Sequence, residues 1–216
     1  MSIMKPTITP HNILHFMRTL KGMGIDTYLF DKGDRMTLVK LRKEVRQCSK
    51  CALAKTRKHV VFGEGDVNAR LVFVGEAPGE EEDIQGRPFV GRAGKLLDQL
   101  IGRIGLGRDD VYICNVLKCR PPGNRDPEEQ ERELCKHYLF TQLELINPKI
   151  ICTLGRHAYN TLLGVDERIT RIRGVLTSYR GTPLLPTYHP SFLLRNQNKI
   201  NEAWEDMEKL KQLLRK

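Results

Sequence analysis

The chain has 216 residues, six cysteines and a formal net charge of +10. Its length supports one sizeable core and excludes two ordinary domains joined by a linker. It shows neither a signal-peptide pattern nor a run of about 18 apolar residues, so we expect a cytoplasmic protein without membrane contact. The excess of Lys and Arg favours a polyanionic partner such as nucleic acid, although solvated lysines alone also give basic chains.

The N-terminal stretch is predicted to be an accessory element. Residues 1–35 are expected to form a helical extension, because a Thr-Pro pair precedes apolar residues at helical spacing. The main domain is expected to span 36–216. Its first helix is predicted to open at Thr37 and to end just before Cys48 and Cys51.

Four apolar runs then alternate with helical patterns; the runs cover 71–74, 111–116, 150–154 and 184–188. Strands that are apolar throughout and alternate with helices indicate a parallel sheet covered on both faces. We therefore predict an α/β fold, a single-domain, three-layer α/β/α arrangement around a central, mostly parallel four-stranded sheet. Amphipathic stripes place its longer helices at about 96–104, 126–146 and 200–214.

Candidate functional residues follow the ends of these strands, where open α/β sheets usually bind ligands. The sequence Gly-Glu-Ala-Pro-Gly (75–79) follows the first run, Asn115 ends the second, and His189 follows the last. These three also have a purely structural interpretation: a stiff turn, a turn-forming amide and a satisfied structural histidine, respectively. The tripeptide Gly-Arg-His (155–157) follows the third run.

Two further segments lie between the first two runs. The acidic run 80–83 suits a solvated loop or divalent-metal ligands, and the local sequence does not choose between them. A glycine-rich loop over 86–94 then opens a helix, where backbone N–H groups suit an anion. Phe89, inside this loop, would be poorly buried unless it packs on a ligand or a neighbouring element.

Four cysteines have a spacing that suits one metal centre: C-x2-C, 67 residues, C, 15 residues, C (Cys48, Cys51, Cys119 and Cys135). Four thiolates accept either zinc or an iron–sulfur cluster, and the spacing does not separate the two. The other two cysteines, Cys114 and Cys152, stand in apolar runs and are interpreted as small buried hydrophobic residues.

Several long motifs in the same order closely resemble the family 4 uracil-DNA glycosylases, the iron–sulfur branch of that superfamily. They are GEAPGEEED (75–83), GRPFVGRAG (86–94), NVLKCRPPGNR (115–125) and HPS (189–191), together with all four cysteine positions. The resemblance runs from about Thr37 to Lys216. It implies an enzyme that flips uracil out of single- or double-stranded DNA and hydrolyses its N-glycosidic bond, leaving an abasic site. We expect it to act as a monomer.

The resemblance also implies roles for individual residues. Phe89 would stack on the flipped uracil, and Asn115 would read the edge that carries O4 and N3–H. His189 would donate to O2 as negative charge accumulates on the leaving base. Backbone groups after the first strand would line the rest of the pocket (Gly75, Glu76 and Ala77).

The attacking water lacks an obvious partner. Ala77 stands where the best-known branch of the superfamily has a water-positioning Asp, which leaves Glu76 as the nearest ionisable candidate. After His189, the resemblance to the family's minor-groove wedge implies that Leu193 fills the space vacated by the base. Phosphate contacts would come from the flanking polar residues, Ser191 and Arg195. The alternative is that Leu193 begins the core stripe of the last helix.

For the four cysteines, the resemblance favours a structural 4Fe-4S cluster, with no catalytic metal or nucleotide. A non-catalytic iron–sulfur DNA-binding or redox module is the competing interpretation, because the cysteines and the basic charge alone permit it. The joint presence of Phe89, Asn115 and His189 argues against that module. A relative that bonds covalently to uracil is disfavoured, since no basic histidine-containing insertion follows Gly94.

Overall fold

The computed structural model describes residues 36–215. The predicted helical extension, residues 1–35, lies outside the described residues. From Thr37 onward the chain forms one compact unit in which helices and strands alternate, as the apolar periodicity predicts. None of the helices in the described part is both long and apolar enough to cross a membrane.

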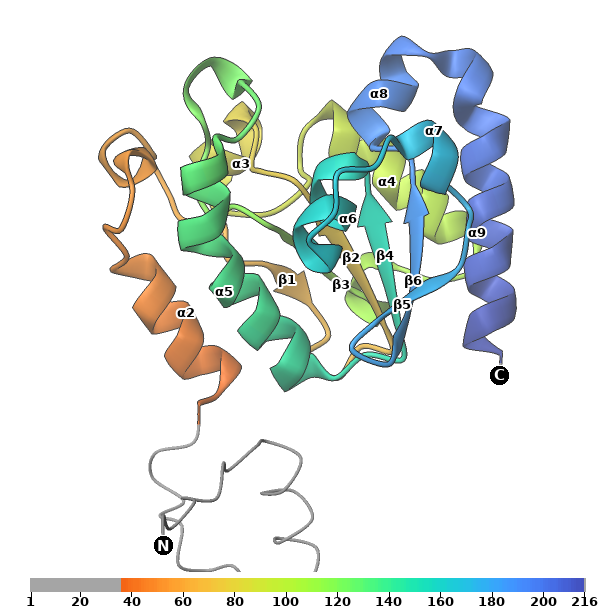
Figure 1. Ribbon diagram of the computed structural model, residues 1–216, viewed down its shortest axis with the longest axis horizontal. Helices are drawn as coiled ribbons and strands as arrows, with labels where there is room; N and C mark the ends of the chain where they lie inside the picture. The colour runs from red at the N-terminus through yellow and green to blue at the C-terminus, as the bar shows by residue number, and fades with distance from the viewer. Residues whose placement is uncertain (1–35, 216) are drawn as a thin grey trace, which may run out of the picture. The chain divides into compact units, whose positions relative to one another are not determined.

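The centre of the fold is a mixed sheet with the strand order β1-β3-β2-β4-β6-β5 (Figure 1). Its four middle strands are parallel and correspond to the four predicted runs: β2 (Leu71–Gly75), β3 (Tyr112–Asn115), β4 (Ile150–Leu154) and β6 (Thr182–Thr187). The first three are buried along their whole length, because helices cover both faces. The predicted α/β class with a mostly parallel sheet is confirmed.

The predicted number of four strands is too low, because two short antiparallel strands close the edges. β1 (Glu64–Gly65) pairs with β3, and β5 (Thr177–Tyr179) pairs with β6. β1 has only two residues and β5 only three, so neither is long enough to show an apolar run. The β5–β6 hairpin turns at Arg180-Gly181, where both residues have positive φ.

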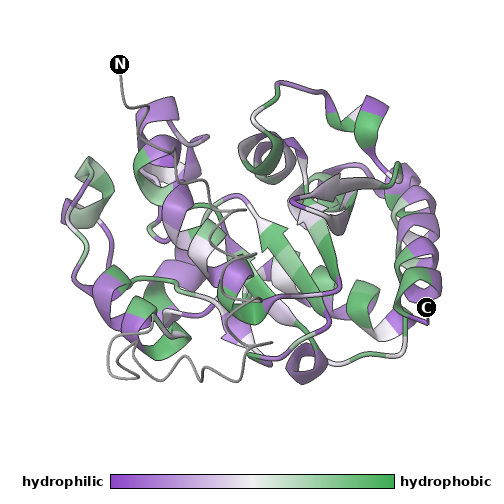
Figure 2. Cartoon of the chain, turned by 60° about the horizontal axis from the view of Figure 1, so that its bottom comes forward, coloured by the Kyte–Doolittle hydropathy of each residue, from purple (hydrophilic) through white to green (hydrophobic). Residues whose placement is uncertain are grey.

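Helices cover the sheet in two layers, and Figure 2 shows hydrophobic strands between them. α4 (Arg92–Arg103) and α9 (Ile200–Leu214) bury their apolar stripes on one face. α5 (Glu129–Ile146) and α6 (Arg156–Leu163) cover the other. α2 (Leu38–Arg46) is capped by Thr37 and packs outside α5. Short elements complete this part of the chain: η1 (Ala52–Lys55), η2 (Arg108–Asp110), η3 (Pro122–Asn124), α7 (Ile169–Ile172) and η4 (Gln197–Lys199).

The acidic run forms a helix, α3 (Glu80–Gln85), and two of its carboxylates hold backbone groups. Glu82 accepts hydrogen bonds from the backbone N–H groups of Gly79, Val90 and Gly91 at 2.8–3.0 Å. Asp83 is buried and accepts from two backbone N–H groups of the 58–59 segment. The expectation of a solvated loop is therefore wrong for this half of the run, because these carboxylates replace water as acceptors.

Candidate active site

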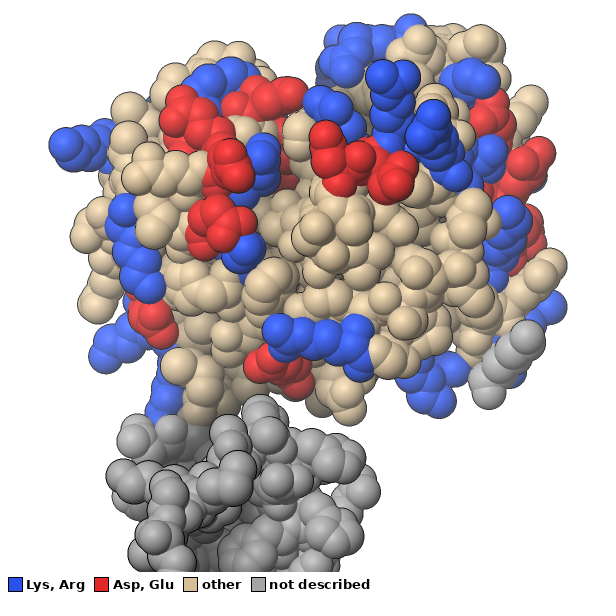
Figure 3. All heavy atoms as spheres, viewed as in Figure 1, with Lys and Arg blue, Asp and Glu red and all other residues tan. Residues whose placement is uncertain are grey.

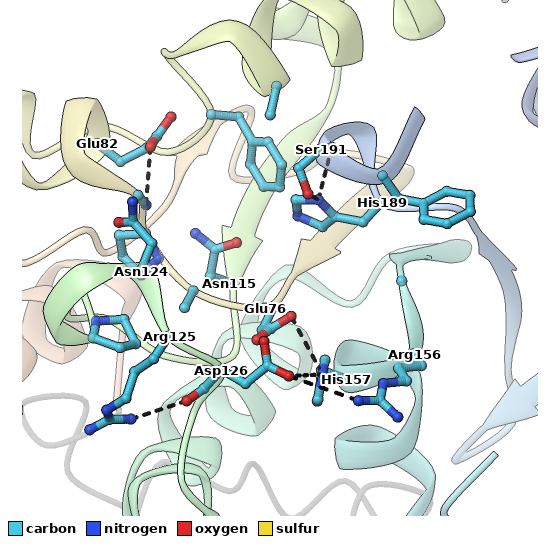
Figure 4. Close-up of a pocket in the computed structure, with 18 of the residues that line it drawn as sticks. Glu76, Glu82, Asn115, Asn124, Arg125, Asp126, Arg156, His157, His189 and Ser191 are labelled. Carbon is cyan, nitrogen blue, oxygen red and sulfur yellow. Dashed lines mark hydrogen bonds and ion pairs between the residues drawn. The ribbon is translucent and has the colours of Figure 1, made fainter. Parts of the chain in front are cut away.

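A pocket of about 550 Å³ opens at the carboxyl ends of the parallel strands (Figure 4). Parallel strands bring their ends to one edge, so residues far apart in sequence meet there. The pocket lining comes from the ends of four strands: Glu76 and Ala77 after β2, Asn115 in β3, Gly155 after β4, and Tyr188 and His189 after β6. Phe89 also lines the pocket. The structure thus brings together five of the predicted residues: Glu76, Ala77, Phe89, Asn115 and His189.

Gly75 supports this pocket from behind and is not among its lining residues. It pairs with Asn115 across β2 and β3. A Cβ atom at Gly75 would lie 2.3 Å from Oδ1 of Asn115 and 2.5 Å from the Phe89 ring. Glycine is required here because only its bare backbone lets the amide and the ring approach this closely.

Asn115 carries a buried polar atom without a partner. Its side chain is 1% exposed, and its Oδ1 has no hydrogen-bond partner in the structure. A buried acceptor left unpaired costs about 1–3 kcal/mol, so such groups are rare unless a ligand satisfies them. In a pocket wall, this amide is an unfilled recognition element for a ligand with an N–H donor.

Phe89 is held in an unusual backbone conformation. Its φ is +51°, a region that side chains larger than glycine seldom adopt. Arg108 fixes the loop by donating to the carbonyl oxygens of Pro88 (2.5 Å) and Phe89 (3.0 Å). The Phe89 ring is buried beside Asn115, with its centroid 5.7 Å from that of His189. The strained backbone at Phe89 therefore holds a flat apolar ring against the pocket.

His189 is a neutral donor. The backbone N–H of Ser191 donates to its Nδ1 at 3.1 Å, so the neutral ring carries its proton on Nε2. Burial lowers the pKa of His189 to about 4, and Arg195 and His157 add to the effect. At neutral pH the ring is uncharged, and its Nε2–H is left to donate to a ligand.

Glu76 is a pocket carboxyl with a raised pKa. Its side chain is 24% exposed. Burial raises its pKa to about 7; the nearby Asp126 also raises it, while Arg156 and Arg132 lower it. Such a carboxyl changes its ionisation near neutral pH, as a general base does.

The segment after His189 is a short helix, α8 (Pro190–Arg195), where a wedge loop was expected. Ser191, Phe192 and Arg195 line the pocket, and the predicted phosphate contacts of Ser191 and Arg195 stay predictions. Leu193 does not: it is 1% exposed and packs in the core with α4 and α9. The structure thus favours the alternative core interpretation of Leu193, since helical periodicity turns this residue inward.

The four predicted metal-ligand cysteines line one small cavity, whereas Cys114 and Cys152 are buried in the cores on the two faces of the sheet. Cys48 and Cys51 follow α2, Cys119 follows β3, and Cys135 lies in α5. Four thiolates gathered at one cavity can hold either a zinc ion or an iron–sulfur cluster.

Lys118 connects the cysteine cavity to the pocket and is a residue that the sequence reasoning missed. It is 1% exposed and lines the cysteine cavity. Its Nζ donates to the carbonyl oxygen of Asn115 at 2.7 Å and to Gln142 at 2.5 Å. Burial lowers the pKa of this lysine, and the neighbouring cysteines oppose the shift. A lysine beside a cysteine gives no sequence signal for burial, because lysine is normally exposed.

Charge is unevenly distributed around the pocket. Figure 3 shows Lys and Arg gathered over α7 and α8, and Asp and Glu over the side that carries α3. Among the described residues, three exposed arginines of the α7–α8 side, called the basic rim below, form no ion pair: Arg168, Arg171 and Arg195, of which Arg195 lines the pocket. By contrast, Arg173 pairs with three acidic residues of α9. Unpaired exposed arginines at a pocket mouth suit a polyanion.

Comparison with known proteins assigns this fold and site to a family. The model of the "Uracil DNA glycosylase superfamily" matches residues 62–208, which include the pocket residues named above. The chain belongs to this superfamily.

Among its curated relatives are type-4 uracil-DNA glycosylases. The Thermotoga maritima protein is 46% identical over 192 residues, covering 87% of this chain and 99% of the relative. The Sulfurisphaera tokodaii protein is 48% identical, covering 82% and 84%, and the Saccharolobus solfataricus protein is 50% identical, covering 79% and 83%. The resemblance to family 4 inferred from the motifs is confirmed.

Proposed function

We propose that this protein is a uracil-DNA glycosylase: it removes uracil from DNA by hydrolysing the N-glycosidic bond, a step of base-excision repair. The observation that carries the proposal is the buried, unpartnered Oδ1 of Asn115 in a pocket that the Phe89 ring and the donor His189 also line. A pocket that offers an acceptor, a flat apolar ring and a neutral N–H donor matches the chemistry of uracil.

Recognition follows from these three groups. The nucleotide rotates out of the stack, at a cost of a few kcal/mol, and the base stacks on Phe89. Asn115 accepts from N3–H with Oδ1 and donates to O4 with its amide. Cytosine has an acceptor at N3 and a donor at C4, so it would leave the buried amide unpaired.

Bond cleavage requires charge stabilisation on both sides of the bond. As C1′–N1 breaks, the electron pair moves onto uracil, and the Nε2–H of His189 donates to O2, an effect worth about 3 kcal/mol. Water attacks the oxocarbenium-like C1′ and passes its proton to the Glu76 carboxylate. No protein-bound metal or nucleotide takes part in these steps.

The four cysteines fit a 4Fe-4S cluster, and we propose that Cys48, Cys51, Cys119 and Cys135 hold it. When bound, such a cluster would cross-link the segments after α2 and β3 to α5. Lys118 then lies between the cluster ligands and the backbone of Asn115, so the cluster supports the recognition residue structurally. Its role is proposed to be structural and separate from the hydrolysis.

DNA contact is assigned to the basic rim. We propose that Arg195, with Ser191 and the neighbouring Arg168, binds phosphates on the α7–α8 side of the pocket. The glycosylase domain is proposed to comprise 36–216, acting as a monomer on uracil-containing DNA. No observation favours the alternative of a non-catalytic iron–sulfur module.

Uracil release from defined oligonucleotides tests the proposal. We expect release from uracil-containing DNA without added metal or nucleotide, and none from cytosine-containing DNA of the same sequence. Asn115→Ala and His189→Ala should lower the excision rate by about 100-fold or more while changing DNA affinity much less. Equal losses of rate and affinity would mean that the two residues only bind DNA.

A further inference from the structure

Glu76 shares its wall of the pocket with three side chains from two other segments (Figure 4). Nε2 of His157 lies 3.9 Å from Oε2 of Glu76 and 3.5 Å from Oδ2 of Asp126. Nη2 of Arg156 lies 3.8 Å from the same Asp126 oxygen. His157 and Arg156 open α6, whereas Asp126 precedes α5.

This group places charges of opposite sign near one carboxyl. Asp126 disfavours the ionised form of Glu76 by like-charge repulsion, and Arg156 favours it. Arg132 also favours it, from the first turn of α5. His157 has a lowered pKa because of burial, with Arg156 the next cause, so it is a neutral spacer at neutral pH. Among residues 36–215, these four contact Glu76 or act on its charge, and His189, Arg125, Arg195 and Glu82 line the same pocket.

We propose that Asp126 and Arg156 are positioning residues that control how readily Glu76 takes up the proton of the attacking water. Asp126 favours the protonated form of Glu76 and Arg156 favours its ionised form, with His157 lying beside both carboxyl groups. The inference rests on the proposed glycosylase function and deepens it. In the step concerned, the water oxygen bonds to C1′ while C1′–N1 breaks and its electron pair leaves with uracil. The released proton goes to the Glu76 carboxylate.

Their arrangement explains how Glu76, whose side chain is only 24% exposed, can still serve as a base. A base is most effective when its pKa lies near the working pH. Burial alone raises the pKa of a carboxyl, and Asp126 raises it further. Arg156 and Arg132 limit this rise, so that Glu76 is ionised in a useful fraction of molecules at neutral pH.

The test is the pH dependence of single-turnover excision at saturating enzyme, from about pH 5 to about pH 9, because this rate reports ionisation in the bound complex. For the unmodified protein we expect the rate to fall below about pH 7. Asp126→Asn should move this acid limb to lower pH by about half a unit. Arg156→Gln should move it to higher pH by a similar amount.

Two remote variants provide matched controls for the loss of one charge. Glu208→Gln in α9 removes an exposed anion, and Lys149→Gln just before β4 removes an exposed cation at the opposite end of the parallel strands from the pocket. Neither should move the acid limb. If they moved it as far as the pocket variants do, net charge would explain the effect and the proposal would fail. Glu76→Gln should lower the plateau and abolish the limb.

Opposite shifts for Asp126→Asn and Arg156→Gln would support the proposal. Shifts in the same direction, or a lower plateau with an unmoved limb, would overturn it while leaving the glycosylase function intact. An acid limb that persists in Glu76→Gln would also overturn it, because another group would then be titrating. If the unmodified protein released no uracil at any pH, the proposed function would fall and this inference with it.

Discussion

The Glu76 carboxyl is harder to ionise in the folded chain than in the unfolded chain. Burial is the chief cause that raises the pKa of this carboxyl in the folded chain from its ordinary value of 4.5 to about 7. Between these two values the folded state binds more protons than the unfolded state, so the stability contributed by the protonated carboxyl is lost as pH rises through about 7. By this linkage, the ionised carboxylate costs up to about 3 kcal/mol above neutral pH.

We therefore expect Glu76→Gln to melt at a higher temperature than the unmodified protein at pH 8, with a smaller difference at pH 5, and to excise uracil far more slowly. Thermal melting at both pH values, with Glu208→Gln as the exposed-charge control, measures the effect. A melting difference that did not depend on pH would contradict the explanation by ionisation.

Individual side chains also show which residues of the site can be identified from the sequence and which cannot. Asn115 and His189 were identifiable because each stands in a motif at a strand end, and Phe89 because it stands in a glycine-rich motif. His157 was noticed only as part of the Gly-Arg-His tripeptide after a strand. Its contact with Glu76 depends on neighbours from other elements, as do the contacts of Lys118 and Asp126. Nothing in the residue types shows that a lysine is buried or that a carboxylate faces Glu76.

At the scale of elements, the cysteine cavity lies where three segments of the chain meet. These segments belong to different helices and strands. The ends of α2 and β3 and the second turn of α5 each contribute cysteines. Two other cysteines, Cys114 and Cys152, are buried in strands of the same sheet and serve as internal controls.

We expect Cys135→Ala to abolish the visible absorbance of a purified holoprotein and to lower its melting temperature sharply, because a metal centre that binds only the folded state adds its binding energy to stability. Cys114→Ala should keep the absorbance and lose only about 1 kcal/mol for a small cavity. Absorbance spectra, iron content and melting curves measure these outcomes. Comparable losses of absorbance in both variants would refute the ligand assignment.

Long, strongly periodic elements were the predictable ones. The four parallel strands lie where continuous apolar runs predict them, because both of their faces are buried. The helices α4, α5 and α9 lie where amphipathic periodicity predicts them, because one of their faces is buried. Helices α3 and α8 and strands β1 and β5 were missed, since each is too short to show a period. They are held in part by specific tertiary contacts, such as the three backbone N–H groups that Glu82 satisfies.

At the scale of the molecule, Lys and Arg gather over α7 and α8, while Asp and Glu are prominent over the side that carries α3 (Figure 3). A phosphate contact releases condensed counterions, so each contact adds about 0.9 to the slope of log affinity against log salt concentration. Lys149 offers a matched comparison, because it is exposed at the start of β4, at the opposite end of the parallel strands from the pocket.

We expect Arg195→Ala to weaken DNA binding several-fold and to reduce the salt slope by about one unit. Lys149→Ala should leave the slope unchanged. Titrations of an oligonucleotide with a non-hydrolysable uracil analogue at several salt concentrations measure both quantities. An equal reduction by the two variants would show that overall charge, and not the rim, governs binding.

The sequence by itself determined the family, the α/β class, the four central strands and the cysteine set, because long motifs and buried periodicity are local properties of the chain. Only the tertiary structure decided that Leu193 faces the core, that Lys118 links the cysteine cavity to Asn115, and that Asp126 and Arg156 surround Glu76. These features depend on which side chains meet across the ends of the strands, and no spacing along the chain encodes those distances.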